Sequence, residues 1–292
     1  MALNFNHLLQ KIKTNLDKWG KFKLTLWGKN NVIKMIVAPQ FNYVAMMLPI
    51  KIPSTTFRQL DDVIKHFLWD GKRPRIKLRK LCAHKEKGGL GLPDLSMYYL
   101  AFEMAKIARY WQATEDKAAW IKVEKEICSP FQPIEELSQK RSNITNPILL
   151  HSRDVWSRVH KMFELKHTLQ RYSPLWYNPD VCIGKKCVYW KQWHSRGLST
   201  INDLFEDGVF LSYDKLLQKC NLEGKDHFCK FLQIRSCIIS KPYNITDNEV
   251  IDYMKLPLGK RKASQFYKIA NSSLGNDRPV KDDLAEGPWW RD

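Results

Sequence analysis

Apolar residues recur at helical spacing through the first 68 residues of the chain. Leu8, Ile12 and Leu16 lie four residues apart, and Gly20 ends this first pattern. Such spacing places the apolar side chains on one face of a helix. Two further stripes follow after short connections, which predicts a small bundle of three helices. Their members are Val32, Ile33, Ile36 and Val37, and then Phe57, Leu60, Ile64, Phe67 and Leu68.

Capping residues and a proline indicate where the second and third helices begin or break. The second helix should begin near Thr25 or Trp27. Pro39 should kink or restart it, because proline has no backbone N–H to donate. Thr56 and Gln59 have the spacing of a capping box, in which each side chain accepts a hydrogen bond from the other residue's backbone N–H. We therefore expect the third helix to begin near Thr56.

The next segment, residues 69–94, is basic and then rich in glycine. Asp70-Gly71 breaks the helical pattern, and six of the nine residues from Lys72 to Lys80 are basic. The run from Arg75 to Arg79 alternates basic with apolar residues, which is typical of a strand with one charged face. Glycines follow at positions 88, 89 and 91. The segment is therefore predicted to be a basic connector, shaped as a hairpin or an extended tongue.

The remainder of the chain also has helical patterns. Pro93-Asp94 should cap a long helix that reaches about Gln112 and is apolar on two sides, as a buried helix is. The span from Trp120 to Ile127 predicts one more short helix, and the prolines between Ser129 and Pro147 predict a linker. Later helices, with Ser212 and Asp226 as caps, are predicted around Trp156–Phe163, Ile201–Phe205, Tyr213–Cys220 and Phe228–Ile238.

These patterns predict a mainly α fold made of five consecutive parts. A three-helix bundle occupies residues 1–68 and the basic connector residues 69–94. Central helices span 95–128, and a linker spans 129–147. A helical C-terminal domain occupies residues 148–292 and ends in a disordered tail.

The charge of the chain is strongly positive and unevenly distributed. The 292 residues carry a formal net charge of +18, with 18 basic and 5 acidic residues between Met1 and Leu90. Lysine and arginine are almost never buried without partners, so a run this basic fits a polyanion held outside the protein. A solvated charged loop is the alternative interpretation. Alternation with Ile76 and Leu78 anchors the run on the fold, which favours phosphate contact.

The candidate phosphate contacts lie in the connector and in the second helix. The glycine-rich part lacks the Gly-Lys-Ser/Thr of a phosphate-binding loop, so we interpret it as a tight turn before a helix. Trp27 with the neighbouring lysines fits either a minor-groove contact or a core tryptophan at a helix start, and both interpretations stay open. The candidate contacts are Lys29, Lys34, Lys72, Arg73, Arg75, Lys77, Arg79, Lys80, Lys85 and Lys87.

Three blocks of sequence resemble one known family. Residues 69–76, Trp-Asp-Gly-Lys-Arg-Pro-Arg-Ile, followed by residues 88–93, Gly-Gly-Leu-Gly-Leu-Pro, resemble the segment after the catalytic domain in LINE-type non-LTR retrotransposon reverse transcriptases. Upstream, residues 24–29 and 32–35 resemble the start of the thumb in the same polyproteins, and Phe228 to Ile238 is similar to a further block. The blocks occur in the family's order and extend along most of the chain.

The resemblance implies that residues 1–68 form a thumb-like bundle that grips the template–primer duplex. It also implies that the downstream part binds element RNA or target DNA. RNA, DNA or an RNA–DNA hybrid is then the expected partner. A non-functional retroelement remnant, or a helical structural or interaction protein, is the alternative. Apolar surface left exposed at Trp19, Trp27 or Phe41 would favour that alternative.

No catalytic motif is evident in this sequence, and we expect no enzyme activity. Reverse transcriptases need a Tyr/Phe-x-Asp-Asp turn for two metal ions. Asp61-Asp62 lies within the third helix and Asp282-Asp283 in a polar tail, so neither fits. Gly-x-Ser-x-Gly and His-Glu-x-x-His are also missing from the sequence. We expect no cofactor and no small-molecule substrate.

The cysteines are expected to be reduced thiols, and no metal site is predicted. Seven cysteines are widely scattered, and Cys182 with Cys187, or the group from Cys220 to Cys237, lacks convincing zinc spacing. Small buried thiols are the preferred interpretation. The N-terminus is too polar for a signal peptide, and the apolar stretch Val32–Ile50 is interrupted by Lys34 and polar residues. We expect an intracellular protein of the nucleus, the cytoplasm or both, not secreted and not in a membrane.

Overall fold

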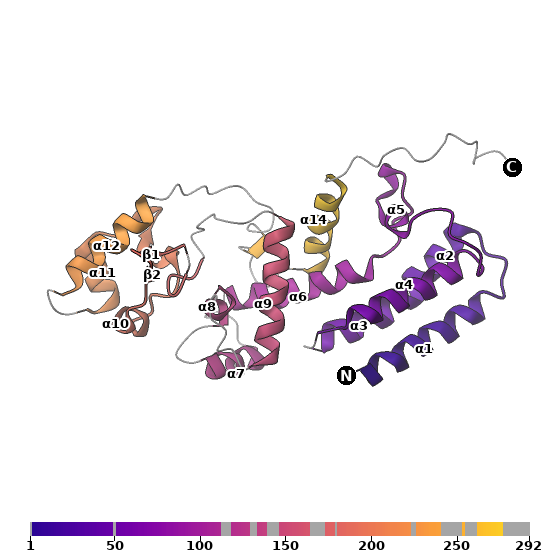
Figure 1. Ribbon diagram of the computed structural model, residues 1–292, viewed down its shortest axis with the longest axis horizontal. Helices are drawn as coiled ribbons and strands as arrows, with labels where there is room; N and C mark the ends of the chain where they lie inside the picture. Colours follow the sequence, from indigo (N-terminus) through magenta and orange to yellow (C-terminus); the bar gives the residue numbers. More distant parts are fainter. Residues whose placement is uncertain are drawn as a thin grey trace. The chain divides into compact units, whose positions relative to one another are not determined.

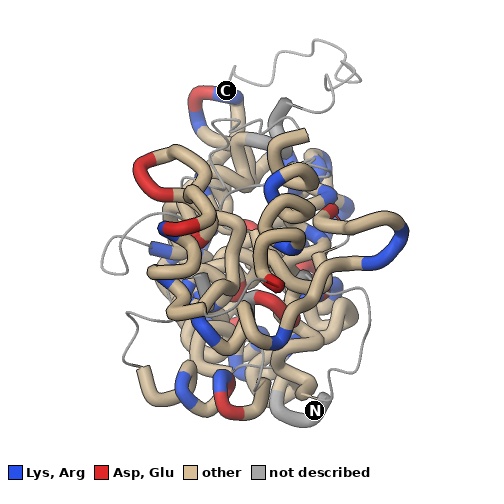
Figure 2. The backbone as a smooth tube through the Cα atoms, turned by 90° about the vertical axis from the view of Figure 1, so that its left-hand side faces the viewer, with Lys and Arg blue, Asp and Glu red and all other residues tan. Residues whose placement is uncertain are grey.

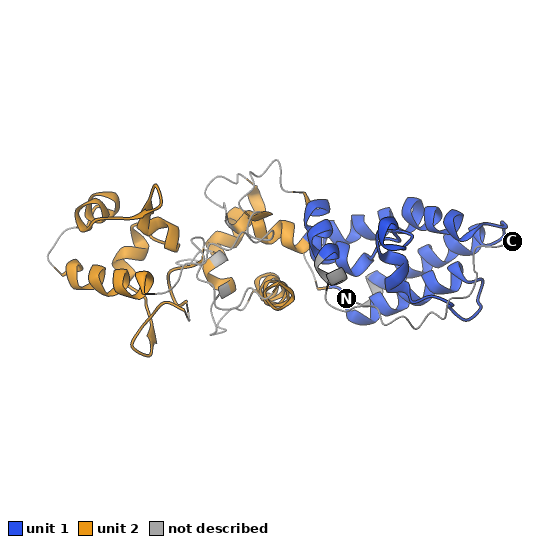
Figure 3. Cartoon of the chain, turned by 90° about the horizontal axis from the view of Figure 1, so that it is seen from above, with its two compact units in different colours: residues 1–48, 52–102, 263–292 blue, residues 49–51, 103–262 orange. Residues whose placement is uncertain are grey.

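The chain is mainly α-helical, which confirms the predicted fold class (Figure 1). The computed structural model describes residues 2–48, 51–111, 118–128, 133–138, 146–163, 173–178, 180–222, 226–240, 253–254 and 262–276. The chain forms two compact units (Figure 3). Unit 1 contains residues 1–48, 52–102 and 263–292, and unit 2 contains residues 49–51 and 103–262. The boundaries predicted from sequence stay predictions, and the predicted tail lies outside the described residues.

Unit 1 begins with the predicted bundle, formed by α1 (Ala2–Trp19), α2 (Leu26–Val32), α3 (Ala38–Met47) and α4 (Ser54–Leu68). Helix α1 packs against α3 and α4. The apolar stripes meet in the core of the bundle, where they exclude water. The buried side chains are Phe5, Leu8, Ile12, Leu16, Ile33, Val37, Phe41, Ala45, Leu60, Ile64, Phe67 and Leu68.

A π-helix separates α2 from α3. It spans Ile33–Val37, and the N–H of Ala38 donates to the carbonyl of Ile33. Pro39 follows in the first turn of α3. An α-helical turn here would press the proline ring against the carbonyl four residues earlier, and the wider π turn relieves this contact. Pro39 was expected to kink or restart the helix, whereas the structure has a local change of helix type within one continuous helical segment.

The predicted start of the third helix is wrong. Helix α4 begins at Ser54 with Pro53 as its N-cap residue, and no side-chain capping bond is present there. Thr56 lies inside the first turn, where its N–H donates to the carbonyl of Pro53 and its side chain is buried. Pro53 is held in the extended conformation that suits a residue just before a helix, so the helix starts two residues earlier than expected.

The predicted strand in the connector is also wrong. Residues 72–77 follow an irregular path, and a short helix, α5 (Leu78–Cys82), replaces the end of the predicted strand. Leu78, Leu81 and Cys82 have helical spacing, and the last two are buried. That spacing prevailed over the short alternation from Arg75 to Arg79. A 3-10 turn, η2 (Lys85–Lys87), follows and leads into the glycines.

Helix α6 (Leu95–Trp111) begins as predicted. The Asp94 side chain accepts hydrogen bonds from the Met97 N–H at 3.0 Å and from the Ser96 hydroxyl at 2.8 Å, so Asp94 is its N-cap. In unit 1, Tyr98 stacks on Tyr267 of α14 (Ala263–Asn276), with ring centroids 4.0 Å apart. The prediction of a helix that is buried on more than one side is confirmed by its side chains, which include Leu100, Ala101, Met104, Ile107 and Ala108.

Unit 2 continues with α7 (Ala119–Cys128), α8 (Pro133–Ser138) and α9 (Pro147–Met162). The Asn146 side chain caps α9 by accepting from the Ile148 N–H at 2.9 Å. Its amide also donates to Glu124 at 2.9 Å, which ties α7 to the start of α9. The predicted linker, residues 129–147, is described only at 133–138 and 146–147. The first of these ranges is helix α8, and the second is the start of α9.

The last part of unit 2 contains two small hairpins. They pair β1 (Cys182–Ile183) with β2 (Lys186–Cys187) and β3 (Phe205–Glu206) with β4 (Val209–Phe210). Two-residue strands are too short to leave an alternating pattern, so the sequence did not predict them. Around them lie α10 (Lys191–Ser195), η3 (Ile201–Leu204), α11 (Tyr213–Cys220) and α12 (His227–Ile239).

These elements enclose a core around Trp176 and Trp193, both fully buried. The indole N–H of Trp176 donates to the carbonyl of Leu198, and that of Trp193 donates to His227 Nδ1 at 3.1 Å. Ser212 caps α11 as predicted, since its hydroxyl accepts from the Lys215 N–H at 3.3 Å. Asp226 lies at the predicted N-cap position of α12 but makes no side-chain capping bond there.

A buried cluster of ionisable side chains joins α6 to α9 within unit 2. Glu103 accepts from Lys106 at 2.7 Å, and His151 Nε2 lies 3.6 Å from the Glu103 carboxylate. Burial raises the pKa of Glu103, and Lys106 opposes this rise. Burial, aided by the charges of Lys51 and Lys106, lowers the pKa of His151 to about 4. His151 is therefore neutral in the folded protein under conditions that would charge it in the unfolded chain.

Lowering the pH should reveal this difference in His151 protonation as a loss of stability. Between about pH 6.5 and pH 4 the unfolded chain binds a proton at His151 that the folded chain does not, so stability falls as the pH falls. We expect His151→Gln to remove about 1–3 kcal/mol of the loss between these pH values. Urea unfolding at neutral and acidic pH measures it, with His7→Gln as a control at an exposed histidine. An equal acid loss in His151→Gln and the unsubstituted chain would contradict this assignment.

Candidate nucleic-acid interface

The basic segment starts at a sharp turn that ends α4. Asp70 and Gly71 both have left-handed backbone conformations, with φ of 49° and 74°. The Gly71 N–H donates to the carbonyl of His66 at 2.9 Å, which closes the last turn of the helix. Asp70 and Gly71 are residue types that tolerate this conformation. The chain therefore leaves the helix abruptly and enters the run of cations that begins at Lys72.

Lys29 fixes this turn from the neighbouring helix α2. Its side chain is 4% exposed, and its ammonium group donates to the carbonyl of Leu68 at 3.2 Å and to the Asp70 carboxylate at 2.5 Å. The Leu68 carbonyl belongs to the last turn of α4, where carbonyls lack partners within the helix and attract a positive charge. Lys29 is therefore a structural link between α2 and α4, and we remove it from the set of candidate phosphate contacts.

The glycine-rich turn folds back on α5 and uses its backbone N–H groups internally. Gly88 donates to Lys85, Gly89 to His84, and Gly91 to the carbonyl of Ala83, at 2.9–3.1 Å. Leu90 and Leu92 both donate to the carbonyl of Leu81 at 3.0 Å. With these amides occupied, the turn has no cradle of free N–H groups for phosphate. The interpretation as a tight turn is confirmed.

Two glycines are required by the geometry of this turn. A Cβ atom at Gly89 would lie 2.0 Å from the carbonyl oxygen of Ala83, far inside contact distance. Gly88 has φ of 75°, although a Cβ there would meet open space. Gly89 therefore permits a close approach of two backbone segments, whereas Gly88 permits a left-handed turn.

Side chains of α2 and the π-helix lie beside this turn. Asn30 donates from its side-chain amide to the carbonyl of Leu90 at 2.8 Å. A Cβ at Gly91 would lie 3.6 Å from the Lys34 ammonium, which places that amine next to the turn. Lys85 lies over the ring of Trp27, 4.9 Å from its centroid. The fold thus brings one predicted cation from each segment, Lys34 of the π-helix and Lys85 of the connector, to this turn.

The other predicted cations lie at the surface. Figure 2 marks Lys and Arg in blue on both helices and loops of the chain. Lys80 is half-buried, and Ile76 and Leu78 are half-buried between exposed basic residues, which anchors the segment as expected. Glu86 is the acidic residue between Lys72 and Lys87, so the segment retains a large positive excess. The exposed predicted cations are Lys34, Lys72, Arg73, Arg75, Lys77, Arg79, Lys85 and Lys87.

A second group of aromatic and basic side chains lies at the end of α1, where no site was predicted. Trp19 is 39% and Phe22 is 62% exposed, with ring centroids 5.7 Å apart. Lys18, Lys21 and Lys23 are exposed beside them. Exposed aromatic rings flanked by cations suit stacking on unpaired bases. The run Trp-Gly-Lys-Phe-Lys, which begins at the last residue of α1, was the signal in the sequence. It was missed because Trp19, three residues after Leu16, also fits the spacing of the apolar stripe.

The paired aspartates of α4, groups of metal-ligating side chains and apolar helices were the remaining places to look for a site or a membrane span. Asp62 pairs with Lys65 at 3.2 Å on the exposed side of α4, where Asp61 is its neighbour. Across the described ranges, no three His, Cys, Asp or Glu side chains converge in a way that could hold a metal ion. Within those same ranges, every helix is too short or too polar to span a bilayer.

The chain is similar over part of its length to one curated plant protein. No protein-family model matches the chain. A stretch of 93 residues is 26% identical to a protein of Arabidopsis thaliana named "Putative ribonuclease H protein". This stretch covers 30% of the chain and 15% of the plant protein. The match therefore spans a small part of that protein's length.

The two glycines should respond differently to substitution. Gly89→Ala forces its Cβ against the backbone of Ala83, so we expect a loss of about 3 kcal/mol or more in unfolding free energy. Gly88→Ala carries the cost of a left-handed alanine alone, about 1–2 kcal/mol. Urea unfolding followed by circular dichroism compares the two. Equal losses would mean that the close approach at Gly89 does not limit the turn.

Lys29 should matter for stability rather than for binding. Lys29→Met leaves the Leu68 carbonyl and Asp70 without their cation, at a cost of about 2 kcal/mol. Lys65→Met, which removes an exposed pair with Asp62, should cost less than about 1 kcal/mol. Chemical denaturation measures both variants. If Lys29→Met instead kept full stability and weakened nucleic-acid binding, Lys29 would be a phosphate contact after all.

Proposed function

We propose that this chain is a non-catalytic, nucleic-acid-binding part of a LINE-type reverse transcriptase polyprotein. In this proposal unit 1 contains the thumb, and the segment from Lys72 to Lys87 contacts the phosphate backbone of the bound duplex. The observation that carries the proposal is the exposure of this basic segment on an anchored framework. The turn at Asp70 and Gly71 fixes its start, and the glycine turn fixes its end.

Phosphate contact is the chemistry that these side chains support best. Arginine and lysine donate hydrogen bonds and carry charge, and they neutralise phosphates with release of counterions. Half-buried Ile76 and Leu78 hold the intervening backbone, so the cations are presented in a defined order. Phosphate contacts fix position and carry no sequence information. We therefore expect binding that depends on charge and duplex shape, with little base specificity.

Exposed aromatic rings of unit 1 support a second kind of contact. Trp27 is 45% exposed and carries Lys85 over its ring. Trp19 and Phe22 form a further exposed pair beside lysines. Rings of this kind stack on bases of single strands, as happens where a duplex ends or a template is unpaired. RNA, DNA and an RNA–DNA hybrid are all suitable partners on these grounds.

The partial similarity to the plant protein agrees with a nucleic-acid role, since that protein is named as a putative ribonuclease H protein. The retroelement assignment rests on sequence blocks at residues 24–29 and 32–35, at residues 69–76 and 88–93, and at residues 228–238. We propose that this chain itself performs no catalysis, because Asp61-Asp62 and Asp282-Asp283 do not fit a polymerase metal site. The polymerase chemistry of the parent family would belong to another part of the polyprotein.

Exposed apolar side chains support a second candidate, an interaction protein or a remnant that has lost its packing partner. Phe41 is fully buried, but Trp19 and Trp27 are not. Four large apolar residues between the π-helix and the end of α3 are also 51–76% exposed. Patches of this kind mark protein contacts or unpaired surfaces. These residues are Met35, Tyr43, Met46 and Met47.

A salt titration of binding to an RNA–DNA hybrid duplex tests the proposed function. About six phosphate contacts predict a slope of log K against log salt of about −5. Replacing Arg73, Arg75, Lys77 and Arg79 with Ala should flatten the slope by about 3–4, because each lost contact removes about 0.9. Fluorescence anisotropy at several salt concentrations measures both proteins.

A control with the same loss of charge separates a contact surface from general attraction. Lys185, Lys186, Lys191 and Arg196 are exposed cations of unit 2. Their replacement with Ala lowers the net charge equally and should leave the slope unchanged within about 1. Equal slopes for the connector variant and the unsubstituted chain, or no binding at low salt, would sink the proposal and favour the interaction-protein candidate.

A further inference from the structure

Two cysteines face each other across the first hairpin of unit 2. Cys182 of β1 pairs with Cys187 of β2, and their sulfur atoms are 3.6 Å apart. The neighbouring ladder hydrogen bond runs from the Val188 N–H to the carbonyl of Val181 at 3.1 Å. The cysteine pair is therefore a position without ladder hydrogen bonds, where cross-strand side chains approach most closely.

The base of this hairpin is held firmly by the core. Val181 and Val188 are buried in the core around Trp176 and Trp193. The Tyr177 N–H donates to the carbonyl of Val188 at 3.0 Å. Gly184, with φ of 65°, permits the turn at the other end. The two thiols are thus kept opposite each other by a fixed framework at one end and a tight turn at the other.

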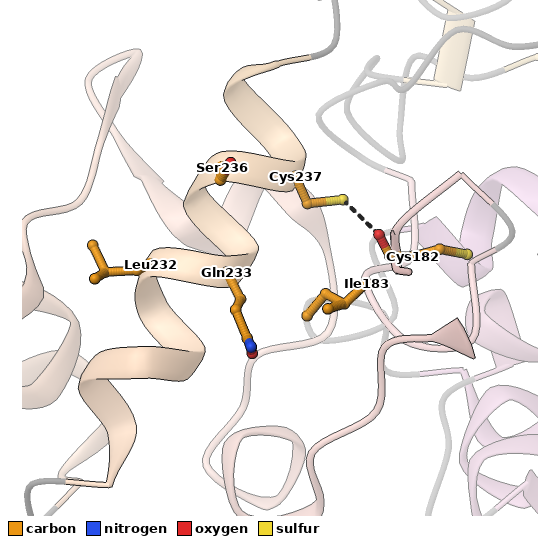
Figure 4. A pocket seen from close by; sticks show the side chains of 6 residues that line it. All are labelled: Cys182, Ile183, Leu232, Gln233, Ser236 and Cys237. Carbon is orange, nitrogen blue, oxygen red and sulfur yellow. Dashed lines mark hydrogen bonds between the residues drawn. The ribbon is translucent and has the colours of Figure 1, made fainter. Parts of the chain in front are cut away.

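A third cysteine is nearby and has a different orientation. Figure 4 shows the Cys237 side chain on α12 directed at the carbonyl oxygen of Cys182, to which its thiol donates at 3.4 Å. The Cys182 thiol lies 3.8 Å from the carbonyl of Asn178 and faces Cys187 across the hairpin. The geometry therefore favours a bond between Cys182 and Cys187 over one between Cys182 and Cys237.

One thiol of the pair is open to small reagents. Cys187 is exposed, and Cys182 is half-buried opposite it. Cys182 also contributes to the lining of a surface hollow of about 410 Å³ between β1 and α12, but its sulfur atom points away from this hollow (Figure 4). The rest of the lining is mostly uncharged: Ile183, Leu232, Gln233, Ser236 and Cys237. Forming a bond of about 2 Å between the sulfurs needs side-chain rotation rather than movement of the paired strands.

We propose that Cys182 and Cys187 are a reversible thiol-modification site, which forms an intramolecular disulfide by exchange with a small disulfide of the glutathione class. The Cys187 thiolate attacks one sulfur of the small disulfide, and the first small thiolate leaves. The Cys182 thiolate then attacks the Cys187 sulfur of this mixed disulfide, and the second small thiolate leaves. The protein thiols lose two protons and two electrons, and the small disulfide gains both as two thiols.

The bond would act on the hairpin alone. It closes a loop of four intervening residues, so the constraint that it adds is confined to β1, β2 and their turn. The same hairpin contributes Val181 and Val188 to the core and the Cys182 carbonyl to the Cys237 thiol. Oxidation would therefore stiffen the hairpin that forms one edge of the hollow. This inference is independent of the proposed nucleic-acid function.

Incubation of the full chain with glutathione disulfide tests the proposal. We expect the mass of the proteolytic fragment that contains Cys182 and Cys187 to fall by two hydrogen atoms. Peptide mapping should find a Cys182–Cys187 link that a dithiol reductant removes. Cys229, exposed on α12, is the internal control, because it should take a glutathione adduct instead. Cys237→Ser should leave the link unchanged, whereas Cys187→Ser should abolish it.

Three other outcomes would overturn the proposal. One is a link between Cys182 and Cys237, and another is a stable glutathione adduct on Cys187 that does not advance to the internal bond. The third is an unchanged pair under conditions that fully modify Cys229. The central measurement uses the unsubstituted chain, so it does not depend on whether a variant folds.

Discussion

A buried ammonium group at the end of α4 is the contact on which the candidate interface depends. Lys29 neutralises Asp70 and binds a carbonyl of the last turn of α4, and both partners lie about forty positions later in the chain. Burying a charge is costly unless it is paired and hydrogen-bonded, and here both conditions are met. This contact sets the direction in which the chain leaves α4, and it therefore also sets where the cations from Lys72 onward lie.

The glycine turn determines which chemistry remains for recognition. Its backbone N–H groups are used within the turn, so the side chains of the connector are left as the donors for an external anion. Long cationic side chains adapt to a regular line of phosphates, and their contacts with phosphate do not distinguish bases. The rigid backbone and the flexible charges thus have separate roles. In the proposed function, the backbone sets position and the charges provide an attraction that salt weakens.

Much of the helical framework was predictable, because burial follows spacing. Leu8, Ile12 and Leu16 are buried as their period requires, and Asp94 caps α6 as its position indicated. Errors arose where two local signals competed. In the connector, the helical spacing of Leu78, Leu81 and Cys82 prevailed over a five-residue alternation, and at α4 the extended Pro53 moved the start ahead of Thr56.

The candidate site was predicted by residue type better than by position. Exposed cations of the connector were identified from charge density, but nothing local in the sequence indicates that Lys29 meets Asp70. The same limit applies to Cys182 and Cys187, because strands of two residues leave no periodic signal. The exposed pair of Trp19 and Phe22 was hidden by a spacing that also fits a core residue.

The π-helix at Ile33–Val37 has a consequence for which face of α3 meets solvent. A π turn holds about one residue more than an α turn, so it advances every later side chain by about 100° around the axis. With this shift, Phe41 and Ala45 share the buried side with Ile33, while Tyr43 and Met47 point outward. The extra residue acts as a phase shift in the helix. A homologous segment of equal composition without it would turn a different face of α3 to its surroundings.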